Sequence, residues 1–214
     1  GLDCALESRL RYAYDSKIGY LTACPSNVGT GLRVSVMMHL PGLRLMDETE
    51  KVVKGLGRIG LMVRGIYGEG SDAYGNLFQV SNQATMGETE QVIVDRVARM
   101  AGEVAIHETN ARGRLKEVRR AFLEDQVARA TAVLKSARLL GSDETADLIS
   151  ELRLGLALNM IKGLDDRKLA EMMILTRPAH LQMINGGREM DVDERGLLRA
   201  RIVRKKVENI TLCF

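Results

Sequence analysis

The stretch CPSNVGTGLR, residues 24–33, decides how the first part of the chain is interpreted. It joins a thiol, two hydroxyls, two glycines and an arginine in one short loop. Glycines let backbone N–H groups approach and cradle a phosphate, while Arg33 can add a bidentate charge. The residue order is neither that of a P-loop nor GxGxxG. Residue types alone leave two interpretations open, a phosphate-binding loop and an ordinary turn around a buried Cys24.

A second glycine-rich stretch, RGIYGEGSDAYG, occupies residues 64–75. Loops of this length inside a compact domain are usually functional. Arg64 stands at the end of a predicted strand, where its guanidinium can clamp a phosphate, and Glu69 can hold a cationic substrate. The alternative for each of these residues is a salt bridge on the surface.

Glycine placement predicts two kinds of structure along the chain, since 13 of the 21 glycines fall in residues 1–87. That part predicts strands and tight turns. We expect strands at 19–24, 32–40 (buried), 58–63 and 76–80, and an exposed helix over 47–55 with Asp47 as its N-cap. From residue 88 apolar residues recur at helical spacing, and further helices are predicted at 114–139, 143–160, 165–176, 178–185 and 192–209.

Composition excludes several classes of protein. The chain of 214 residues is 45% hydrophobic and carries a net charge of +3, which is too even a balance to indicate nucleic-acid or membrane binding. No apolar run reaches the roughly 18 residues of a membrane span. Three dispersed cysteines argue against a disulfide scaffold and for a reducing compartment, so we expect a cytoplasmic protein. The scattered histidines give no metal-ligand or triad spacing, and no metal-binding residue is predicted.

Taken together, the two loops resemble those of the phosphagen (ATP:guanidino) kinases. Residues 24–33 are similar to the cysteine loop of that family's active site, and residues 64–70 with 79–82 are similar to its substrate loop and the following strand. Within the family, Tyr67 and the predicted helical extension resemble the bacterial branch that phosphorylates arginines in proteins. Metabolic guanidino kinases lack the extension and carry a histidine where Met37 stands, which disfavours a metabolic role.

The resemblance implies roles for particular residues. The Cys24 thiolate would lie beside the substrate guanidinium, Glu69 would bind that guanidinium, and Arg33 and Arg64 would hold the phosphates of ATP, with Mg²⁺ bridging those phosphates. It further assigns ATP-binding positions to Ser26, Asn27, Gly29 and Thr30. The substrate loop would comprise Gly65, Tyr67, Gly68, Gly70 and Ser71.

The last predicted helix contains RGLLRARIVR, residues 195–204, which is similar to the family's phosphoarginine-binding motif RDxxRAxxxR. Arg195, Arg199 and Arg204 match its arginines and imply a phosphoarginine site. Gly196 replaces the acid of the motif, which weakens specific phosphoarginine recognition. The residue types alone also fit a solvated basic face, with Arg195 and Arg199 on one side of the helix.

The predicted fold class is α+β. Residues 1–112 are expected to form the C-terminal half of a phosphagen-kinase-like catalytic domain, an antiparallel sheet flanked by helices, and residues 113–214 an all-helical domain. In the family, further phosphate-binding arginines and a catalytic glutamate precede the cysteine loop, but only 23 residues precede Cys24 here. We therefore expect negligible kinase activity from this chain alone.

The resemblance implies a protein arginine kinase of bacterial stress response and protein quality control, with ATP and Mg²⁺ as cofactors. Implied partners are proteins with exposed arginines, such as a heat-shock repressor and substrates of a Clp protease, together with an activator protein and a second copy in a homodimer. The alternative is a non-catalytic module that binds phosphoarginine or docks a partner.

Overall fold

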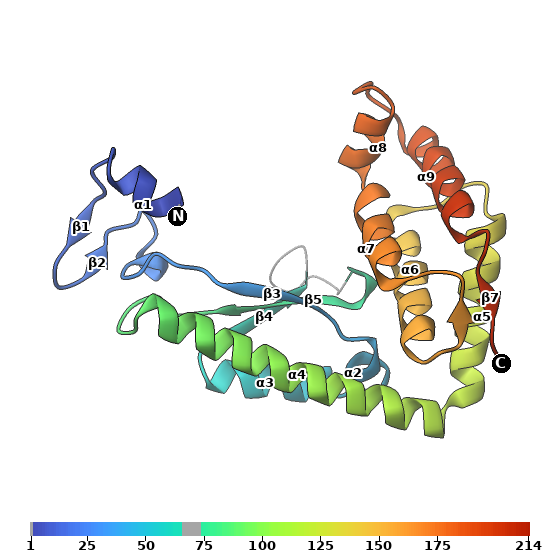
Figure 1. Cartoon of the computed structure of the whole chain (residues 1–214), viewed down its shortest axis with the longest axis horizontal. Helices are drawn as coiled ribbons and strands as arrows, with labels where there is room; N and C mark the ends of the chain where they lie inside the picture. The colour runs from blue at the N-terminus through green and yellow to red at the C-terminus, as the bar shows by residue number, and fades with distance from the viewer. Residues whose placement is uncertain (1, 66–73) are drawn as a thin grey trace.

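The computed structural model of the chain describes residues 2–65 and 74–214. A small N-terminal lobe leads into a three-stranded sheet lying on helices, and a helical part stands at the other end of the sheet (Figure 1). The elements up to the end of the sheet are α1 (Leu2–Glu7), β1 (Tyr14–Asp15), β2 (Gly19–Tyr20), η1 (Pro25–Asn27), β3 (Ser35–His39), α2 (Pro41–Leu45), α3 (Thr49–Arg58), β4 (Leu61–Gly65), η2 (Tyr74–Asn76) and β5 (Leu77–Asn82).

The rest of the chain is mainly helical. Its elements are α4 (Glu90–Val118), α5 (Arg120–Ser136), α6 (Ser142–Ala157), β6 (Ile161–Lys162), α7 (Asp166–Leu175), α8 (Pro178–Ile184), α9 (Val192–Val207) and β7 (Thr211–Leu212). Among the described residues, no helix is both long enough and apolar enough to cross a membrane.

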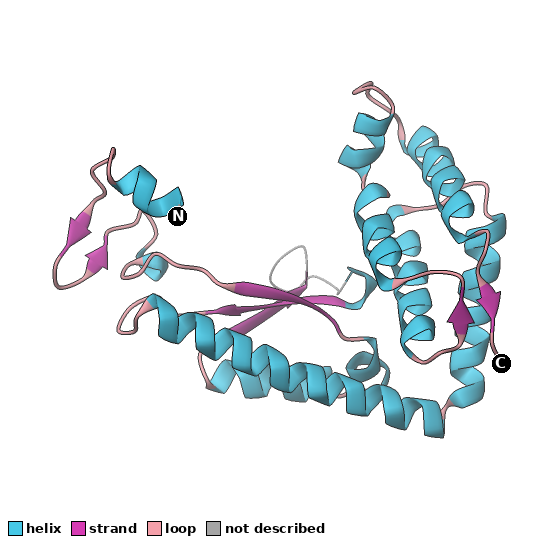
Figure 2. Ribbon diagram, in the orientation of Figure 1, coloured by secondary structure: helices cyan, strands magenta, loops and turns pink. Residues whose placement is uncertain are grey.

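The central sheet has the antiparallel order β3-β5-β4 (Figure 2). Its register places Val36, Val80 and Val63 in one row across the three strands. Neighbouring residues of a strand point to opposite faces, so this row marks the apolar face. These valines belong to a core cluster with Leu56 of α3 and Val104 of α4. The two helices therefore cover the valine face, and the other face carries the polar positions.

A buried carboxylate joins α4 to the end of β3. Glu108 is 4% exposed and accepts hydrogen bonds from the backbone N–H groups of Gly42 (2.8 Å) and Leu43 (2.9 Å), at the start of α2. Arg112, one turn further along α4, donates to Glu108 at 2.5 Å and to the His39 carbonyl at 3.0 Å. The pair thus satisfies free N–H groups at a helix start and fixes the turn that follows β3.

The helical part has its own core, in which α5 packs against α6 and α9. Fully buried residues of these helices include Leu134, Ile149 and Val203. The short strands β6 and β7 pair antiparallel and fasten the C-terminal segment to the turn after α6.

The helical part also contacts the end of the sheet. Ser150 of α6 accepts a hydrogen bond from Asn76 Nδ2 and lies in hydrogen-bond contact with His39 Nε2, both at 2.7 Å. Tyr74 donates from its hydroxyl to the Ser142 carbonyl at 2.9 Å. Gly75 has φ +57°, and a Cβ there would lie 2.9 Å from the Ala146 carbonyl oxygen, so glycine permits this close contact.

The predicted elements agree with the structure in kind and order, with differences at particular points. The predicted buried strand over 32–40 is wrong in its extent and burial, because β3 covers only Ser35–His39 and Met37 is 48% exposed. Asp47 is not the N-cap of α3. It adopts a left-handed φ of +56°, and Glu48 holds the N-cap position, its carboxylate paired with Arg114 at 2.5 Å.

A single helix, α4, crosses residue 112 without a break and ends at Val118, before Arg119 with φ −132°. The predicted helix over 114–139 is therefore wrong in its extent, since α5 covers Arg120–Ser136. The short antiparallel pair β6–β7 adds strands to the part of the chain that was expected to be all-helical. Strands of two residues are too short to show an alternating pattern, so the sequence could not predict them.

Replacing Glu108 with alanine should lower the free energy of unfolding by about 3 kcal/mol, because two backbone N–H groups and the Arg112 guanidinium lose their acceptor. Equilibrium unfolding in urea measures this loss. The matched control is E117A, which removes an exposed carboxylate from the same helix. Equal stability of E108A and E117A would contradict this role.

Candidate active site

The cysteine loop is fastened to the segment that follows β5. Thr85 Oγ1 lies 3.1 Å from the Ser26 carbonyl and 2.8 Å from the Val28 carbonyl and shares its proton between them. The Thr30 N–H donates to the Thr85 carbonyl at 2.8 Å. Gly29, at φ +113°, permits this contact, since a Cβ there would lie 2.3 Å from the Thr85 carbonyl oxygen. The backbone of the loop is therefore held in one shape.

Cys24 is exposed and immediately precedes η1, with its Sγ 3.0 Å from Ser26 Oγ. Hydrogen bonds from the side chain and then the backbone of Ser26 hold the pKa of the Cys24 thiol below its usual value. A lowered pKa increases the fraction of thiolate, the reactive form. The structure thus rules out a buried cysteine in an ordinary turn and presents an accessible thiol with a lowered pKa.

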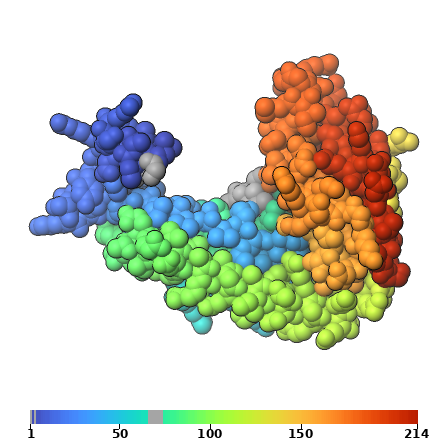
Figure 3. Space-filling model, viewed as in Figure 1, coloured from blue at the N-terminus to red at the C-terminus, as the bar shows by residue number. Residues whose placement is uncertain are grey.

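Arg64 lies on the face of the sheet opposite the valine row. In the register, Arg64, Gln79 and Met37 lie directly across from one another, and the next row on the same face contains Ser81. Arg64 Nε donates to the sulfur of Met62 at 2.7 Å, which holds the start of the guanidinium close to the strand. This polar face borders the hollow between the N-terminal lobe and the helical part (Figure 3).

Arg33 reaches the same face from the segment before β3, where its Nη2 donates to Ser81 Oγ at 3.1 Å. The buried side chain of Asn82 positions that segment: its Oδ1 accepts from the Val34 N–H at 2.7 Å and its Nδ2 donates to the Leu32 carbonyl at 3.0 Å. The sequence predicts only that Ser81 and Asn82 belong to the strand after the substrate loop. The structure shows that Ser81 accepts a hydrogen bond from Arg33 and that Asn82 holds the segment on either side of it.

The structure therefore brings Arg33 and Arg64, 31 positions apart in the sequence, to one polar face, and Cys24 lies in the loop that leads into β3. Of the other predicted loop residues, Ser26 contacts the thiol, and Asn27 donates its N–H to the Cys24 carbonyl at 3.0 Å. Gly65 ends β4 opposite Phe78. The predicted residues Tyr67, Gly68, Glu69, Gly70 and Ser71 lie outside the described residues.

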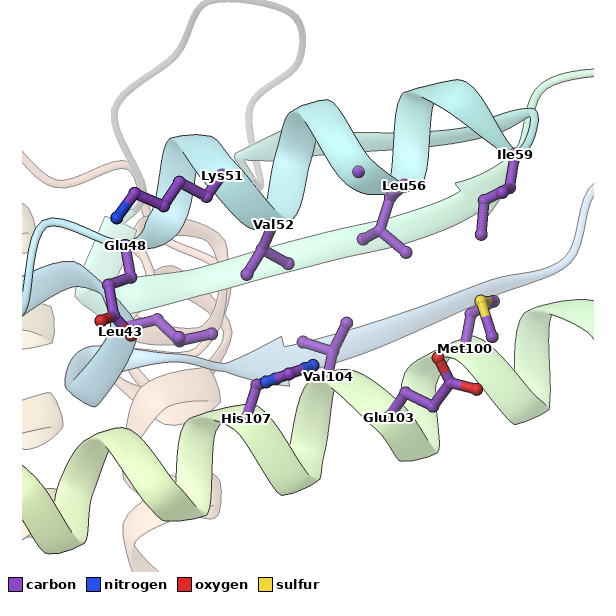
Figure 4. A pocket seen from close by; sticks show the side chains of 11 residues that line it. Leu43, Glu48, Lys51, Val52, Leu56, Ile59, Met100, Glu103, Val104 and His107 are labelled. Atoms are coloured by element: carbon purple, nitrogen blue, oxygen red, sulfur yellow. The ribbon is translucent and has the colours of Figure 1, made fainter.

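An apolar groove of about 660 Å³ between α3 and α4 lies on the covered side of the sheet (Figure 4). Val52 and Leu56 of α3 face Met100 and Val104 of α4 across it. Neither Arg33 nor Arg64 lines it, so the groove is separate from the polar face of the sheet.

The arginines of α9 have different surroundings. Arg199 is 3% exposed and donates to the carbonyls of Thr176 (2.9 Å) and Leu140 (2.6 Å), near the end of α7 and before α6. Arg195 and Arg204 donate to the carbonyls of Met190 and Ala137. Arg195 and Arg199 therefore do not form an exposed pair: the predicted shared face is partly internal, and Arg199 supports the packing of helices.

Gly196 permits close packing next to these arginines. Its carbonyl accepts from the Leu140 N–H at 3.3 Å, and a Cβ would lie 2.9 Å from the Leu139 side chain. A separate cavity of about 460 Å³ is lined by Arg138, Arg188, Arg201 and Arg204, together with Glu194. Sequence reasoning missed Arg138 and Arg188, which lie outside the helix that carries the motif.

Both parts of the chain match known protein families. The family described as ATP:guanido phosphotransferase, C-terminal catalytic domain, matches residues 1–111, and the protein-arginine kinase McsB C-terminal domain matches residues 120–212. The chain therefore belongs to the ATP:guanido phosphotransferase family.

Relatives of similar sequence include protein-arginine kinases of several bacteria. A protein-arginine kinase of Bacillus velezensis is 47% identical over 96% of this chain and 56% of its own length, and one of Moorella thermoacetica is 47% identical over 95% and 58%. The chain thus spans a little over half the length of these relatives. A crystal structure of lombricine kinase is similar over 50% of this chain and 29% of that chain, with 31% identity and a TM-score of 0.43.

Substituting Ser26 with alanine should raise the pKa of the Cys24 thiol, because the hydroxyl that stabilises the thiolate is removed. Alkylation of Cys24 by iodoacetamide at pH 7 should slow, and the rates of the two proteins should converge at a pH above both pKa values. Cys4 and Cys213, both exposed, serve as internal controls when alkylation is followed by peptide mapping. An unchanged pH profile for Cys24 would refute this assignment.

The two arginines Arg199 and Arg201 offer a matched comparison within α9. R199M should lower the free energy of unfolding by about 3 kcal/mol, because two buried carbonyls lose a charged donor. R201M, at an exposed position, should stay within about 0.5 kcal/mol of the unsubstituted protein. If both variants were equally stable in urea unfolding, the structural role of Arg199 would be wrong.

Proposed function

We propose that this chain carries part of the catalytic centre of an ATP-dependent protein arginine kinase, which transfers the γ-phosphate of ATP to arginine side chains of other proteins. The observation that carries the proposal is the placement of Arg33 and Arg64 on one polar face of the sheet, with the activated thiol of Cys24 in the adjoining loop. Membership of the ATP:guanido phosphotransferase family and the similarity to protein-arginine kinases support it.

In this proposal the two guanidinium groups bind phosphate oxygens of ATP and offset the charge of the transferring phosphoryl group. A nitrogen of the substrate guanidinium gives a proton to a catalytic glutamate, which in the family precedes the cysteine loop, and attacks the γ-phosphorus. The bond from that phosphorus to the β,γ-bridging oxygen breaks and ADP leaves. The Cys24 thiolate would stabilise the substrate guanidinium before the attack, and Glu69 would bind it. Ser26, Asn27, Gly29 and Thr30 would form the adjoining wall of the nucleotide site.

Magnesium would be bound by oxygen atoms of the ATP phosphates, which are the hard ligands that this ion prefers. Two arginines and a backbone loop fit a polyphosphate, whose charge needs positive groups and N–H donors. The substrates would be proteins with exposed arginines, and the protein would act in the cytoplasm as a homodimer in stress response.

Calorimetric titration of Mg²⁺–ATP into the chain tests the nucleotide site independently of turnover, which we expect to be negligible for this chain alone. We expect a dissociation constant tighter than about 100 μM, roughly −5.5 kcal/mol. R64A and R33A should each weaken binding by about tenfold or more, since each removes a charged donor to phosphate. R58A, an exposed arginine at the end of α3, is the control and should bind like the unsubstituted chain. Binding that is absent, or unchanged in R33A and R64A, would contradict the proposal.

A second function, binding of phosphoarginine by the helical part, is favoured by the cavity that four arginines line beside α9. Arg188 already contacts Glu194 at 3.4 Å, which places a carboxylate where the guanidinium part of phosphoarginine could pair. R188E combined with R201E should abolish phosphoarginine binding in a calorimetric titration. R167E on α7, away from the cavity, is the control. Retained affinity in the double variant would exclude this cavity as the site.

A further inference from the structure

A small cavity of about 240 Å³ lies where the helical part meets the end of the sheet. Its polar lining comes from four elements: Arg44 of α2, Asn76 of η2, Gln126 of α5, and Asp147, Ser150 and Glu151 of α6. Ser150 is fully buried and makes the hydrogen-bond contacts to His39 and Asn76 that join the two parts of the chain. The cavity therefore adjoins the polar contact that holds the junction together.

Two carboxylates of α6, those of Asp147 and Glu151, line this cavity. They are separated by one helical turn, so they share a face and repel each other when both are ionised. Within the described part of the chain Glu151 forms no hydrogen bond or ion pair, and no neighbouring cation offsets its charge.

The other charged groups at the junction do not offset the charge of Glu151. Arg44 is the cation that lines the cavity, and it donates to Asn76 Oδ1 at 3.1 Å. Its charge acts to lower the pKa of Asp147, against the effect of burial. Asn76 and Gln126, which face the cavity from η2 and α5, are uncharged. The ion pair of Arg153 with Asp166 lines a different cavity, beside β3.

The protonation states of the two titratable groups beside Ser150 differ accordingly. Burial and then the charge of Asp147 raise the pKa of Glu151 to about 7. Burial and then the charge of Arg153 lower the pKa of His39 to about 3, so its ring is neutral across the physiological range. Glu151 is therefore the group at this junction that changes charge near neutral pH.

We propose that Glu151 makes the junction between the sheet and the helical part sensitive to pH: the junction is closed while the carboxyl is protonated and loosens when it ionises. In the folded chain Glu151 holds its proton to a higher pH than in the unfolded chain, so the folded state binds more protons between about pH 4.5 and 7. The stability of the junction consequently falls as pH rises through that window. This inference concerns the contact between the two parts and is independent of the proposed catalytic role.

Hydrogen exchange on the 214-residue chain at pH 5.5 and 8.5, corrected for the intrinsic rate at each pH, tests the inference. The unsubstituted chain should lose protection at pH 8.5 in η2 and in the α6 segment around Ser150, while the α5–α9 core keeps its protection. E151Q, which is isosteric and cannot ionise, should keep protection at both pH values. E117Q, at an exposed position of α4, is the control and should behave as the unsubstituted chain.

Equal pH dependence of protection in E151Q and the unsubstituted chain would overturn the inference. D147N provides a second variant that leaves Glu151 in place. It removes the neighbouring charge that helps to raise the pKa of Glu151, so Glu151 should ionise at lower pH and the loss of protection should move to lower pH. An unchanged midpoint in D147N would likewise overturn the role of this pair.

Discussion

The placement of the candidate site depends on one buried carboxylate, that of Glu108. It binds the first N–H groups of α2 and the guanidinium of Arg112, which also holds the His39 carbonyl at the end of β3. A strand that slipped by one residue would exchange its two faces, and the valine row would turn toward the polar side. By fixing the end of β3 against α4, Glu108 helps to hold the register in which Met37, Gln79 and Arg64 lie on the face opposite the valine row.

The sequence predicted the kinds of element well where the pattern is long. Helical periodicity from residue 88 onward predicted that this part of the chain is helical, but it placed the break between α4 and α5 near residue 112, whereas the break lies at Arg119. The glycine-rich loops marked the strand ends. It could not predict Glu108, because a glutamate in a charged helix has the same local pattern as a solvated residue until α2 folds against it. Asp47 was misjudged for a related reason: its residue type favours an N-cap, but the turn after α2 places it in a left-handed conformation and leaves Glu48 to begin the helix.

In the candidate site, too, the sequence predicted what depends on local residue types and missed what depends on packing between distant elements. Arg33, Arg64 and Cys24 were identified from loop chemistry and family resemblance, and the strand register explains why distant arginines share a face. The run of arginines in α9 looked uniform in the sequence, yet Arg199 is buried against two carbonyls whereas Arg201 faces a cavity. That distinction depends on how α9 packs against the turns at Leu140 and Thr176, a long-range contact that no local pattern encodes. Gly196 reflects this packing too, since it admits Leu139.

The central claim is that the polar face of the sheet, with Arg33 and Arg64, binds the phosphates of ATP. Side-chain Nε–H resonances of arginine in a ¹⁵N-labelled chain, followed during titration with Mg²⁺–ATP, test it most directly. The account predicts saturable shifts at Arg33 and Arg64 with a common dissociation constant, and none at Arg58. Shifts confined to the arginines beside α9, or to residues of the α3–α4 groove, would contradict it.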